Sequence, residues 1–269
     1  MTKRETAQFR KIVRAHFKAK GRDLPWRRTR NPYHIAVSEI MLQQTQVDRV
    51  VPYYERFIKK YSSWESLSKA SFSDVYTLWQ GLGYNRRAKA LRDLASIVVK
   101  KHRGQLPRSI EELIALPGIG PYTARAIATF AYNESHIFIE TNIRTVYLQH
   151  FFKGLGKISD QKLLPLIEAT LPKSDTRSWY FALMDYGASL KRSGIRLNHR
   201  NPIYRPQTKF EGSPRQLRGQ ILKALSAEMM STKKLAKNLS TTQVRLRFEV
   251  ARLLGENLVR EKRGLLGLP

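Results

Sequence analysis

Hydrophobic positions along most of the chain recur every three or four residues, the period of an α-helix that buries one face. Serines stand at several predicted helix starts, among them Ser71, Ser109 and Ser159, where a hydroxyl can cap free N–H groups. No segment before the carboxy-terminal part alternates as a strand would. We therefore predict an all-α body over residues 1–190, with helical spacing in residues 6–20, 47–61, 72–82, 86–102, 109–116, 122–132, 142–152, 161–171 and 177–190.

The pattern changes near the end of this body. No acidic residue occurs from Tyr186 to Phe210, where Lys and Arg mix with Pro and Gly, and we expect an extended basic loop over residues 191–211. Residues 212–269 then show three helical patterns followed by two short strands about Arg263 and Gly264. Helix, helix, helix and hairpin is the order of a winged helix, so we predict a winged-helix-like module there.

The last of these three helices suits the major groove of DNA, because it would expose polar and basic side chains. These are Thr241, Thr242, Arg245, Arg247 and Arg252. A small basic helical cap that only packs on the body remains the alternative interpretation.

Charge narrows the class of partner. The chain has 49 Lys and Arg against 21 Asp and Glu, a formal net charge of +28, which favours a polyanion and above all nucleic acid. No stretch has the length and apolarity of a membrane span, and the first residues look helical rather than like a secretory signal. The sequence contains no cysteine, which excludes disulfides, thiol nucleophiles and thiolate-bound metals. We expect an intracellular protein that does not bind membranes.

The most specific local motif is "LPGIGPYT", from Leu116 to Thr123. A Gly-x-Gly turn between two helices, here Gly118 and Gly120, lets backbone N–H groups approach a phosphate, and the next helix directs its positive dipole end there. The motif predicts a helix-hairpin-helix element, although a plain structural connector would have the same sequence.

Two carboxylates lie in unusual positions. Glu39 interrupts the apolar and amide-rich run "SEIMLQQTQV", and Glu140 precedes the helix of "IETNIRTV". A carboxylate at a helix start is usually a cap, which is the simple interpretation of Glu140. Beside a phosphate-binding hairpin, two carboxylates also suit chemistry at a sugar carbon, where one acid protonates the leaving group and one carboxylate stabilises the positive sugar.

The runs "LPWRRTRNPYHIAVSEIMLQQTQVDRVVPYYERF", "LWQGLGYNRRAKAL", "LPGIGPYTARAI" and "IETNIRTV" resemble the successive motifs of MutY-type adenine DNA glycosylases of the helix-hairpin-helix superfamily. The resemblance extends from about Leu24 to Lys191 with its spacing intact. It implies a two-lobed body, with a six-helix lobe at about residues 28–135 and a second lobe formed by the N-terminal helix and residues 136–190. It also implies a monofunctional base-excision repair glycosylase that hydrolyses the bond between adenine and its sugar.

The resemblance assigns a role to each matching residue. Glu39 corresponds to the general acid, and burial suits that role because it disfavours the charged form of a carboxylic acid. Glu140, Asn142 and Tyr122 would support the reacting sugar, and Trp26, Arg27 and Asp185 would line the pocket for the extruded base. Gln44, Thr45, Leu82 and Tyr84 would probe the gap left by the extruded base and the opposing base. Contacts to DNA are also implied for Gly118, Gly120, Thr123, Arg192 and Arg200. Taken singly, Trp26 and Leu82 could be ordinary core residues, Tyr84 a surface aromatic and Asp185 an ion-pair partner.

Three features depart from the family pattern. Glu140 stands where the family has aspartate, and the extra methylene displaces the charge by roughly an ångström. The positions of four cluster-binding cysteines fall on Lys191, Asn198, Asn201 and Gln207, so we expect no iron–sulfur cluster and no resident metal or other cofactor, apart from a possible monovalent cation at the hairpin backbone. Residues 212–269 are too few and too helical for the Nudix-like module that reads 8-oxoguanine in the family.

The expected partner is double-stranded DNA that contains a mismatch or an oxidised guanine, with adenine removed opposite 8-oxoguanine or guanine. Tyr122 occupies the place of the lysine of bifunctional relatives, so no strand-cleaving lyase step is expected. A mismatch thymine or uracil glycosylase on the same fold and a catalytically weak lesion-binding protein are the alternatives. We expect a cytoplasmic monomer, associated with the nucleoid in a prokaryote.

Overall fold

The computed structural model describes residues 1–269 and is almost entirely helical. None of its helices combines the length and the apolar character that crossing a bilayer requires. The prediction of an all-α body followed by a small winged-helix-like module is confirmed. The elements are α1 (Lys3–Lys20), η1 (Pro25–Arg27), α2 (Pro32–Leu42), α3 (Val47–Lys60), α4 (Trp64–Ser68), α5 (Phe72–Trp79), α6 (Arg86–His102), α7 (Ile110–Ile114), α8 (Pro121–Tyr132), α9 (Thr141–Phe151), α10 (Asp160–Thr170), α11 (Thr176–Arg192), η2 (Asn198–Arg200), α12 (Pro214–Ala227), α13 (Thr232–Asn238), α14 (Gln243–Gly255), β1 (Arg260–Lys262) and β2 (Leu265–Gly267).

The chain divides into two compact units. The first unit contains Met1–Ala36, Arg108–Ile114 and Ile119–Gln207, and the second contains Val37–Pro107, Ala115–Gly118 and Thr208–Pro269. The carboxy-terminal module thus belongs to the same unit as α3 to α6. The domain boundaries proposed from the sequence stay a prediction.

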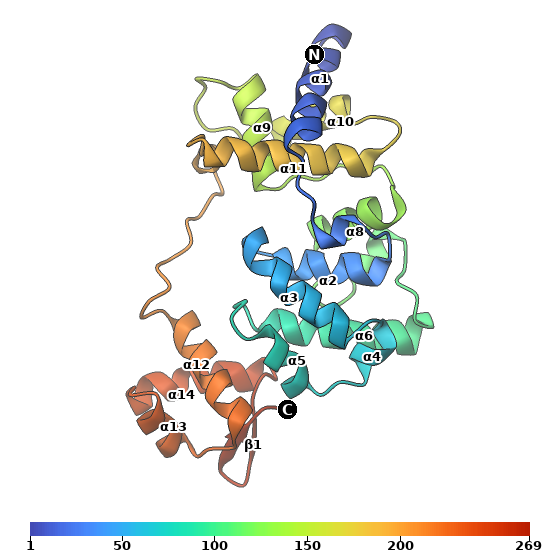
Figure 1. Ribbon diagram of the computed structural model, residues 1–269. Helices are drawn as coiled ribbons and strands as arrows, with labels where there is room; N and C mark the ends of the chain where they lie inside the picture. The colour runs from blue at the N-terminus through green and yellow to red at the C-terminus, as the bar shows by residue number, and fades with distance from the viewer. The chain divides into compact units, whose positions relative to one another are not determined.

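In the first unit, α11 packs against α1 and α9 (Figure 1). The ring of Phe9 on α1 lies 5.2 Å from that of Tyr147 and 5.0 Å from that of Phe151, both on α9, and 6.0 Å from that of Trp179 on α11. Aromatic groups at such distances contribute both buried area and favourable ring geometry. This cluster holds the helix that begins after Glu140 against the helix that carries Asp185.

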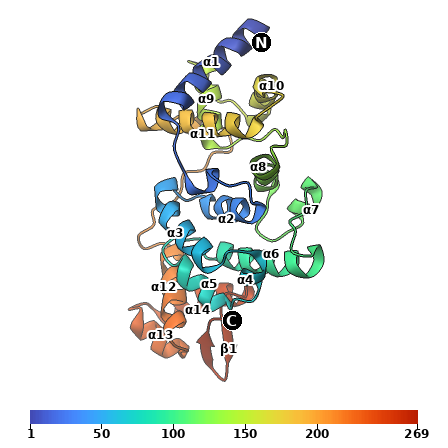
Figure 2. The ribbon, with the colours of Figure 1, turned by 45° about the vertical axis from the view of Figure 1, so that its right-hand side comes forward.

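In the second unit, α4 and α5 pack against α6, whose buried face includes Leu91 and Leu94 (Figure 2). The carboxy-terminal module joins this body through α12, which packs on α5. Within the module, α12 and α13 pack on α14, whose buried face includes Leu246, Val250 and Leu253.

The two strands close the module. β1 and β2 pair antiparallel with Lys262 opposite Leu265, and Met230 forms an isolated bridge to Leu266. The turn at Arg263 and Gly264 has positive φ at both residues, as the tight turns of two-residue hairpins require. The predicted order of three helices and a hairpin is therefore confirmed.

Two local expectations need correction. The extended basic loop predicted over residues 191–211 is wrong for its first two residues, because α11 continues to Arg192. Gly187 allows this helix to approach α9, since a Cβ there would stand 2.2 Å from the Asn142 carbonyl oxygen. Ser159 occupies a cap position but its side chain makes no cap hydrogen bond, whereas Ser71 and Ser109 accept from the N–H groups of Asp74 and Glu112.

Candidate active site

Glu39 lies in α2 of the second unit and is only 6% exposed. Its neighbours Ser38, Ile40 and Met41 are fully buried. A carboxylate is placed in such a setting only when the burial serves a purpose, because desolvation penalises its charged form. The carboxylate that interrupts the "SEIMLQQTQV" run is therefore an interior side chain in the second half of α2.

Two loops of the second unit carry the residues expected to probe DNA. One follows α2 and holds Gln44 and Thr45, and the other joins α5 to α6 and holds Leu82 and Tyr84. Gln44 and Tyr84 have φ of 56° and 46°, the left-handed conformation that non-glycine residues rarely adopt. Such strain persists only where surrounding contacts impose it, and it is concentrated at functional sites.

Arg87 supplies those contacts, and sequence reasoning missed it. Its guanidinium donates to the carbonyls of Ile40 (2.9 Å), Met41 (2.8 Å) and Gln43 (2.6 Å) at the end of α2. It also donates to Thr45 Oγ1 at 3.0 Å and to the Leu82 and Gly83 carbonyls at 3.3 and 3.1 Å. One side chain therefore ties both loops together.

The environment of Arg87 is unusual for an arginine. The residue is 5% exposed, and burial lowers its pKa to about 10. Its hydrogen bonds go to carbonyl and hydroxyl oxygens, including unpaired carbonyls at the negative end of α2. The signal that could have revealed Arg87 is its spacing: with Leu91 and Leu94 it occupies the i, i+4 and i+7 positions of the buried face of α6.

The predicted hairpin lies between α7 and α8. Gly118 has φ of 78°, and its carbonyl accepts a 3.0 Å hydrogen bond from Gln43 Nε2. Gly120 is the N-cap of α8, and Pro121 begins the helix. The N-terminal end of α8 thus has no side chain at its cap, as a backbone phosphate or cation site requires. Thr123 is buried within the first turn of this helix.

The Glu140 carboxylate caps α9 in the first unit. Oε1 accepts from the N–H groups of Asn142 (2.8 Å) and Ile143 (2.9 Å), and Oε2 accepts from Asn142 Nδ2 and Thr141 Oγ1, both at 3.1 Å. These four bonds occupy the acceptor sites of the carboxylate. The group can therefore present its charge to a cation, but it offers no free lone pair with which to activate a water. Nearby, the Tyr122 ring packs edge-on against Phe138 at 5.6 Å.

Arg27 and Asp185, expected in the base pocket, form a two-point ion pair in the first unit. Nη1 and Nη2 of Arg27 donate to the two carboxylate oxygens at 2.8 Å, and Arg22 donates through Nε at 2.7 Å. Burial alone would raise the pKa of Asp185, but the hydrogen bonds and charges of Arg27 and Arg22 lower it below its usual value. The Arg27 guanidinium also lies 4.4 Å from the centre of the Phe181 ring, and Trp26 is buried beside it in η1.

Polar contacts fill the loop where the family has its cluster. Lys191 Nζ donates to Thr141 Oγ1 at 2.9 Å, Asn198 Nδ2 donates to the Thr141 carbonyl at 3.1 Å, and Asn201 Nδ2 donates to Asp160 Oδ1 at 2.7 Å. No group of three or more His, Cys, Asp or Glu residues stands close enough to hold a metal ion. Lys191, Asn198, Asn201 and Gln207 supply no thiolate, and they do not fit an iron–sulfur cluster.

The two basic residues expected to bind DNA from this loop differ in their surroundings. Arg192 is exposed at the end of α11. Arg200 instead donates to the carbonyls of Gly156 at 3.1 Å and Phe152 at 2.8 Å. The Arg200 guanidinium therefore binds the segment after α9. These hydrogen bonds use donors that binding to a DNA phosphate would also need.

Comparison with known proteins identifies the family. Residues 37–168 match the model of the HhH-GPD superfamily base excision DNA repair proteins. The chain is 35% identical over 221 residues to the adenine DNA glycosylase of Mycolicibacterium smegmatis, covering 76% of this chain and 75% of that one. This chain belongs to the adenine DNA glycosylase family.

Other members of the family share less of their length with it. The chain is 40% identical over 166 residues to the adenine DNA glycosylase of Buchnera aphidicola subsp. Baizongia pistaciae, covering 61% of this chain but only 47% of that relative. The chain therefore spans about half of that adenine glycosylase and three quarters of the mycobacterial one.

Solved structures support the glycosylase fold. A thermostable thymine-DNA glycosylase matches with a TM-score of 0.61 and 27% identity, over 69% of this chain and 87% of its own. An endonuclease III–DNA complex matches with a TM-score of 0.58 and 19% identity, over 68% and 85%. The fold alone is thus shared with glycosylases for other bases, while the curated adenine glycosylases are the relatives of higher identity.

Proposed function

We propose that the protein releases adenine from duplex DNA by hydrolysing its bond to deoxyribose, when the adenine lies opposite 8-oxoguanine or guanine. The observation that carries the proposal is the burial of Glu39 within a run that matches the family motif. A buried carboxylic acid is a proton donor suited to a purine, whose ring nitrogens can accept a proton as the base leaves. Thymine offers no equivalent nitrogen.

In this proposal the two carboxyl groups have different roles. Glu39 donates a proton to adenine, the glycosidic bond breaks, and water adds to the resulting sugar cation. The proton that the water loses returns to the Glu39 carboxylate, which restores the acid. Glu140, whose oxygens are engaged by four donors, contributes negative charge that stabilises the cation. Asn142 orients that carboxylate, and Tyr122 supports the sugar.

The proposal is tested by single-turnover cleavage, after alkali, of duplexes carrying A:8-oxoguanine, A:G, T:G and U:G. We expect release of adenine from the first two, with a smaller preference between them than relatives with a Nudix-like module show. Release of thymine or uracil with adenine untouched would overturn the proposal. No release from any duplex would also overturn it. That result would indicate that Glu140, which stands where the family has aspartate, does not support the reaction.

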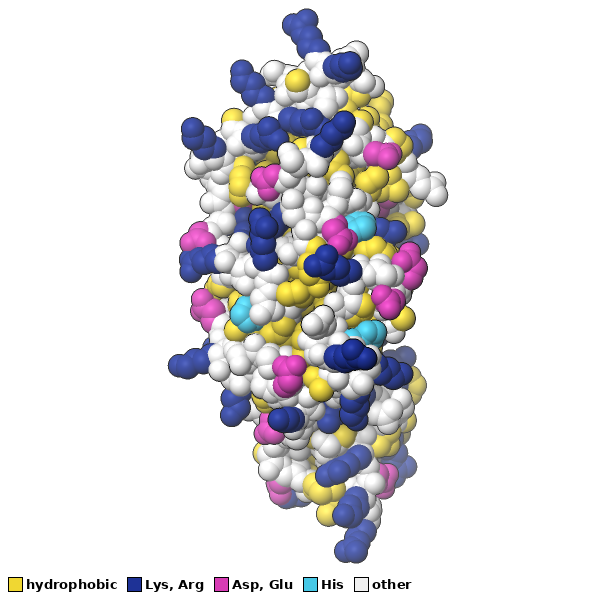
Figure 3. Space-filling view, turned by 90° about the vertical axis from the view of Figure 1, so that its right-hand side faces the viewer, with side chains coloured by type: hydrophobic (Ala, Val, Ile, Leu, Met, Phe, Trp, Pro, Cys, Tyr) yellow, Lys and Arg dark blue, Asp and Glu magenta, His cyan; other side chains and the backbone are white.

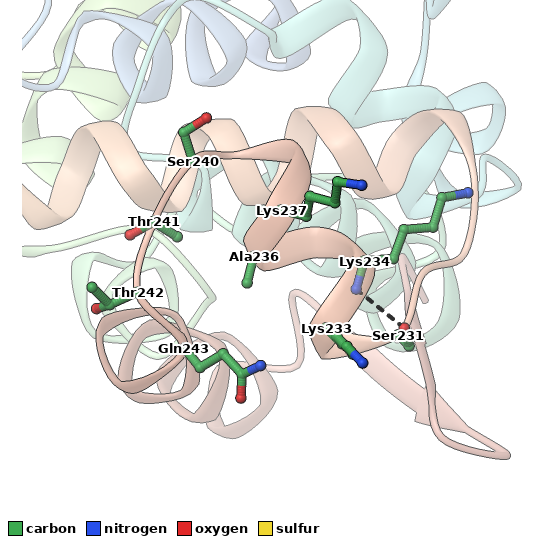
Figure 4. A pocket seen from close by; sticks show the side chains of 9 residues that line it. All are labelled: Ser231, Lys233, Lys234, Ala236, Lys237, Ser240, Thr241, Thr242 and Gln243. Carbon is green, nitrogen blue, oxygen red and sulfur yellow. Dashed lines mark hydrogen bonds between the residues drawn. The ribbon is translucent and has the colours of Figure 1, made fainter.

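We further propose that the carboxy-terminal module binds duplex DNA by its α13 and α14 side. A groove of about 770 Å³ lies there, lined by Ser231, Lys233, Lys234, Ala236, Lys237, Ser240, Thr241, Thr242 and Gln243 (Figure 4). Lys233 and Lys237 add positive charge to it, and Arg247 is an exposed cation on α14, the helix whose first residue, Gln243, lines the groove. Basic side chains around a helix-turn-helix are the arrangement that neutralises backbone phosphates.

Substituting Lys233, Lys237 and Arg247 together by glutamine is expected to flatten the salt dependence of duplex binding. Each lost phosphate contact reduces the slope of log K against log salt by about 0.9. The matched control removes Lys11, Arg14 and Lys18, three exposed cations of α1. Basic side chains are spread over the molecular surface, as the face in Figure 3 shows, so this control separates a specific contact from a general loss of charge. Equal slopes for the two triple variants would contradict the assignment.

A further inference from the structure

The carboxy-terminal module directly contacts the loop expected to read the base opposite adenine. Arg215, at the start of α12, donates from Nη1 to the Tyr84 hydroxyl at 3.0 Å. The two residues lie 131 positions apart in the sequence, and both belong to the second unit. The contact therefore connects the module to a residue of the loop between α5 and α6.

Two guanidinium groups stand near the Tyr84 ring. The guanidinium carbon of Arg215 is 5.8 Å from the ring centre, and that of Arg87 is 5.5 Å from it. Cations within about 6 Å of an aromatic centre are attracted by its quadrupole. Arg87 and Arg215 thus both lie near the Tyr84 ring, and Arg215 also binds its hydroxyl. The Tyr84 backbone is in the left-handed conformation.

Arg215 is itself fixed in place. Its Nη2 donates to the Thr208 carbonyl at 2.6 Å, and the Ser213 side chain caps the helix that carries it. Two further hydrogen bonds anchor the same helix to α5 and to its C-cap residue, Gln80. The Tyr76 hydroxyl donates to the Gly219 carbonyl at 3.4 Å, and Gln80 Nε2 donates to Ser226 Oγ at 3.1 Å. These two hydrogen bonds and the one from Arg215 to Tyr84 all join α12 to the segment from Tyr76 to Tyr84.

We propose that Arg215 is a positioning residue for Tyr84, and that through it the carboxy-terminal module sets how strongly the protein distinguishes the base opposite adenine. The proposal rests on the proposed function and on the role in probing that base which the family resemblance implies for Tyr84. Without the hydrogen bond to its hydroxyl, Tyr84 can leave the left-handed conformation. Its ring then has no fixed position, and the protein binds duplexes with different opposing bases with more similar affinity. Arg215 acts through Tyr84 and needs no contact with the DNA.

The test measures equilibrium binding to duplexes that carry 2′-fluoro-2′-deoxyadenosine, which resists cleavage, opposite either 8-oxoguanine or thymine. We expect wild type to prefer the 8-oxoguanine duplex, and Arg215→Ala to reduce that preference about fivefold, the factor expected from losing one hydrogen bond. Tyr84→Phe removes only the hydroxyl and should reduce the preference similarly. Lys223→Ala is the matched control, because it removes one exposed cation from the same helix.

Arg215→Ala with the same preference as Lys223→Ala would overturn the proposal, as would a wild type that binds both duplexes equally. If Arg215→Ala fails to fold, Tyr84→Phe decides alone, since an unchanged preference in that variant excludes the hydroxyl contact. Release of ordinary adenine is measured in parallel on wild type. Absence of release would refute the proposed function, whereas the binding preference tests Arg215 without any chemistry.

Discussion

Replacing Glu39 by glutamine is expected to stop adenine release while leaving the affinity for mismatched duplex within a few-fold of wild type. The amide keeps the shape of the buried side chain and loses the acidic proton. General acid catalysis contributes about a hundredfold to ten-thousandfold to such reactions, so the single-turnover rate should fall by that factor. The measurement is cleavage of an A:8-oxoguanine duplex with enzyme in excess, together with binding of the uncleavable analogue.

Glu55→Gln is a suitable control for this experiment. Glu55 is an exposed glutamate of α3 in the same unit, and Glu55→Gln makes the same side-chain change without touching the interior. The control should retain the wild-type rate. If Glu39→Gln also retained it, Glu39 would be a structural residue and the proton would have to come from elsewhere.

The second large effect is expected from Arg87→Met. Methionine fills part of the space but donates no hydrogen bond, which leaves the carbonyls of Ile40, Met41 and Leu82 without this partner. The Gly83 carbonyl still accepts from Trp79 Nε1. Unsatisfied buried polar groups cost about 1–3 kcal/mol each, so we expect the free energy of unfolding to fall by about 3 kcal/mol or more. Equilibrium unfolding in urea measures this change.

The neighbouring residue provides the control for Arg87. Arg86 is exposed at the start of α6, so Arg86→Met should change the free energy of unfolding by less than about 0.5 kcal/mol. The free energy of unfolding of Arg87→Lys should lie between those of the two methionine variants. An ammonium keeps the charge, but it lacks the fork geometry with which a guanidinium reaches oxygens on both loops. Equal stability of Arg87→Met and Arg86→Met would show that the buried contacts are dispensable.

The same variant should loosen the two loops that Arg87 joins. Hydrogen exchange at residues 43–46 and 81–84 is expected to accelerate in Arg87→Met more than exchange in the core of α6. Faster exchange spread evenly over the unit would instead indicate a general loss of stability.

The repeating elements were predictable from the sequence because they follow local rules. The three-to-four spacing located most of the helices, but it missed α2, which carries Glu39, and the short α4. The order of three helical patterns and a hairpin anticipated the module at the end of the chain. Gly118 and Gly120 marked the hairpin because its backbone needs positions without side chains. Each of these features depends on neighbours close in sequence, which a period or a turn motif records.

The missed features depend on contacts distant in sequence or on exceptions to the pattern. Arg87 breaks the rule that charges lie outside, so its place on the apolar stripe of α6 was passed over. The pairing of Tyr84 with Arg215 joins residues whose separation no periodicity can span. Gly187 lies within a predicted helix, but the close approach of α9 that requires a glycine there is a contact between distant residues that the sequence does not record. The roles of the individual site residues stay predictions, because they were inferred from the family motifs.

The polar contacts of the loop after α11 bear on how this protein withstands the damage it is proposed to repair. Oxidants that convert guanine to 8-oxoguanine also attack thiolates, and a thiolate-held loop can fail under the conditions in which repair is most needed. Here Arg144 pairs with Asp160 and donates to Asn198, and Asn201 also binds Asp160, so amide, guanidinium and carboxylate groups hold the segment. These groups are not oxidised as thiolates are, so the contacts that hold this loop do not depend on the redox state of a cysteine.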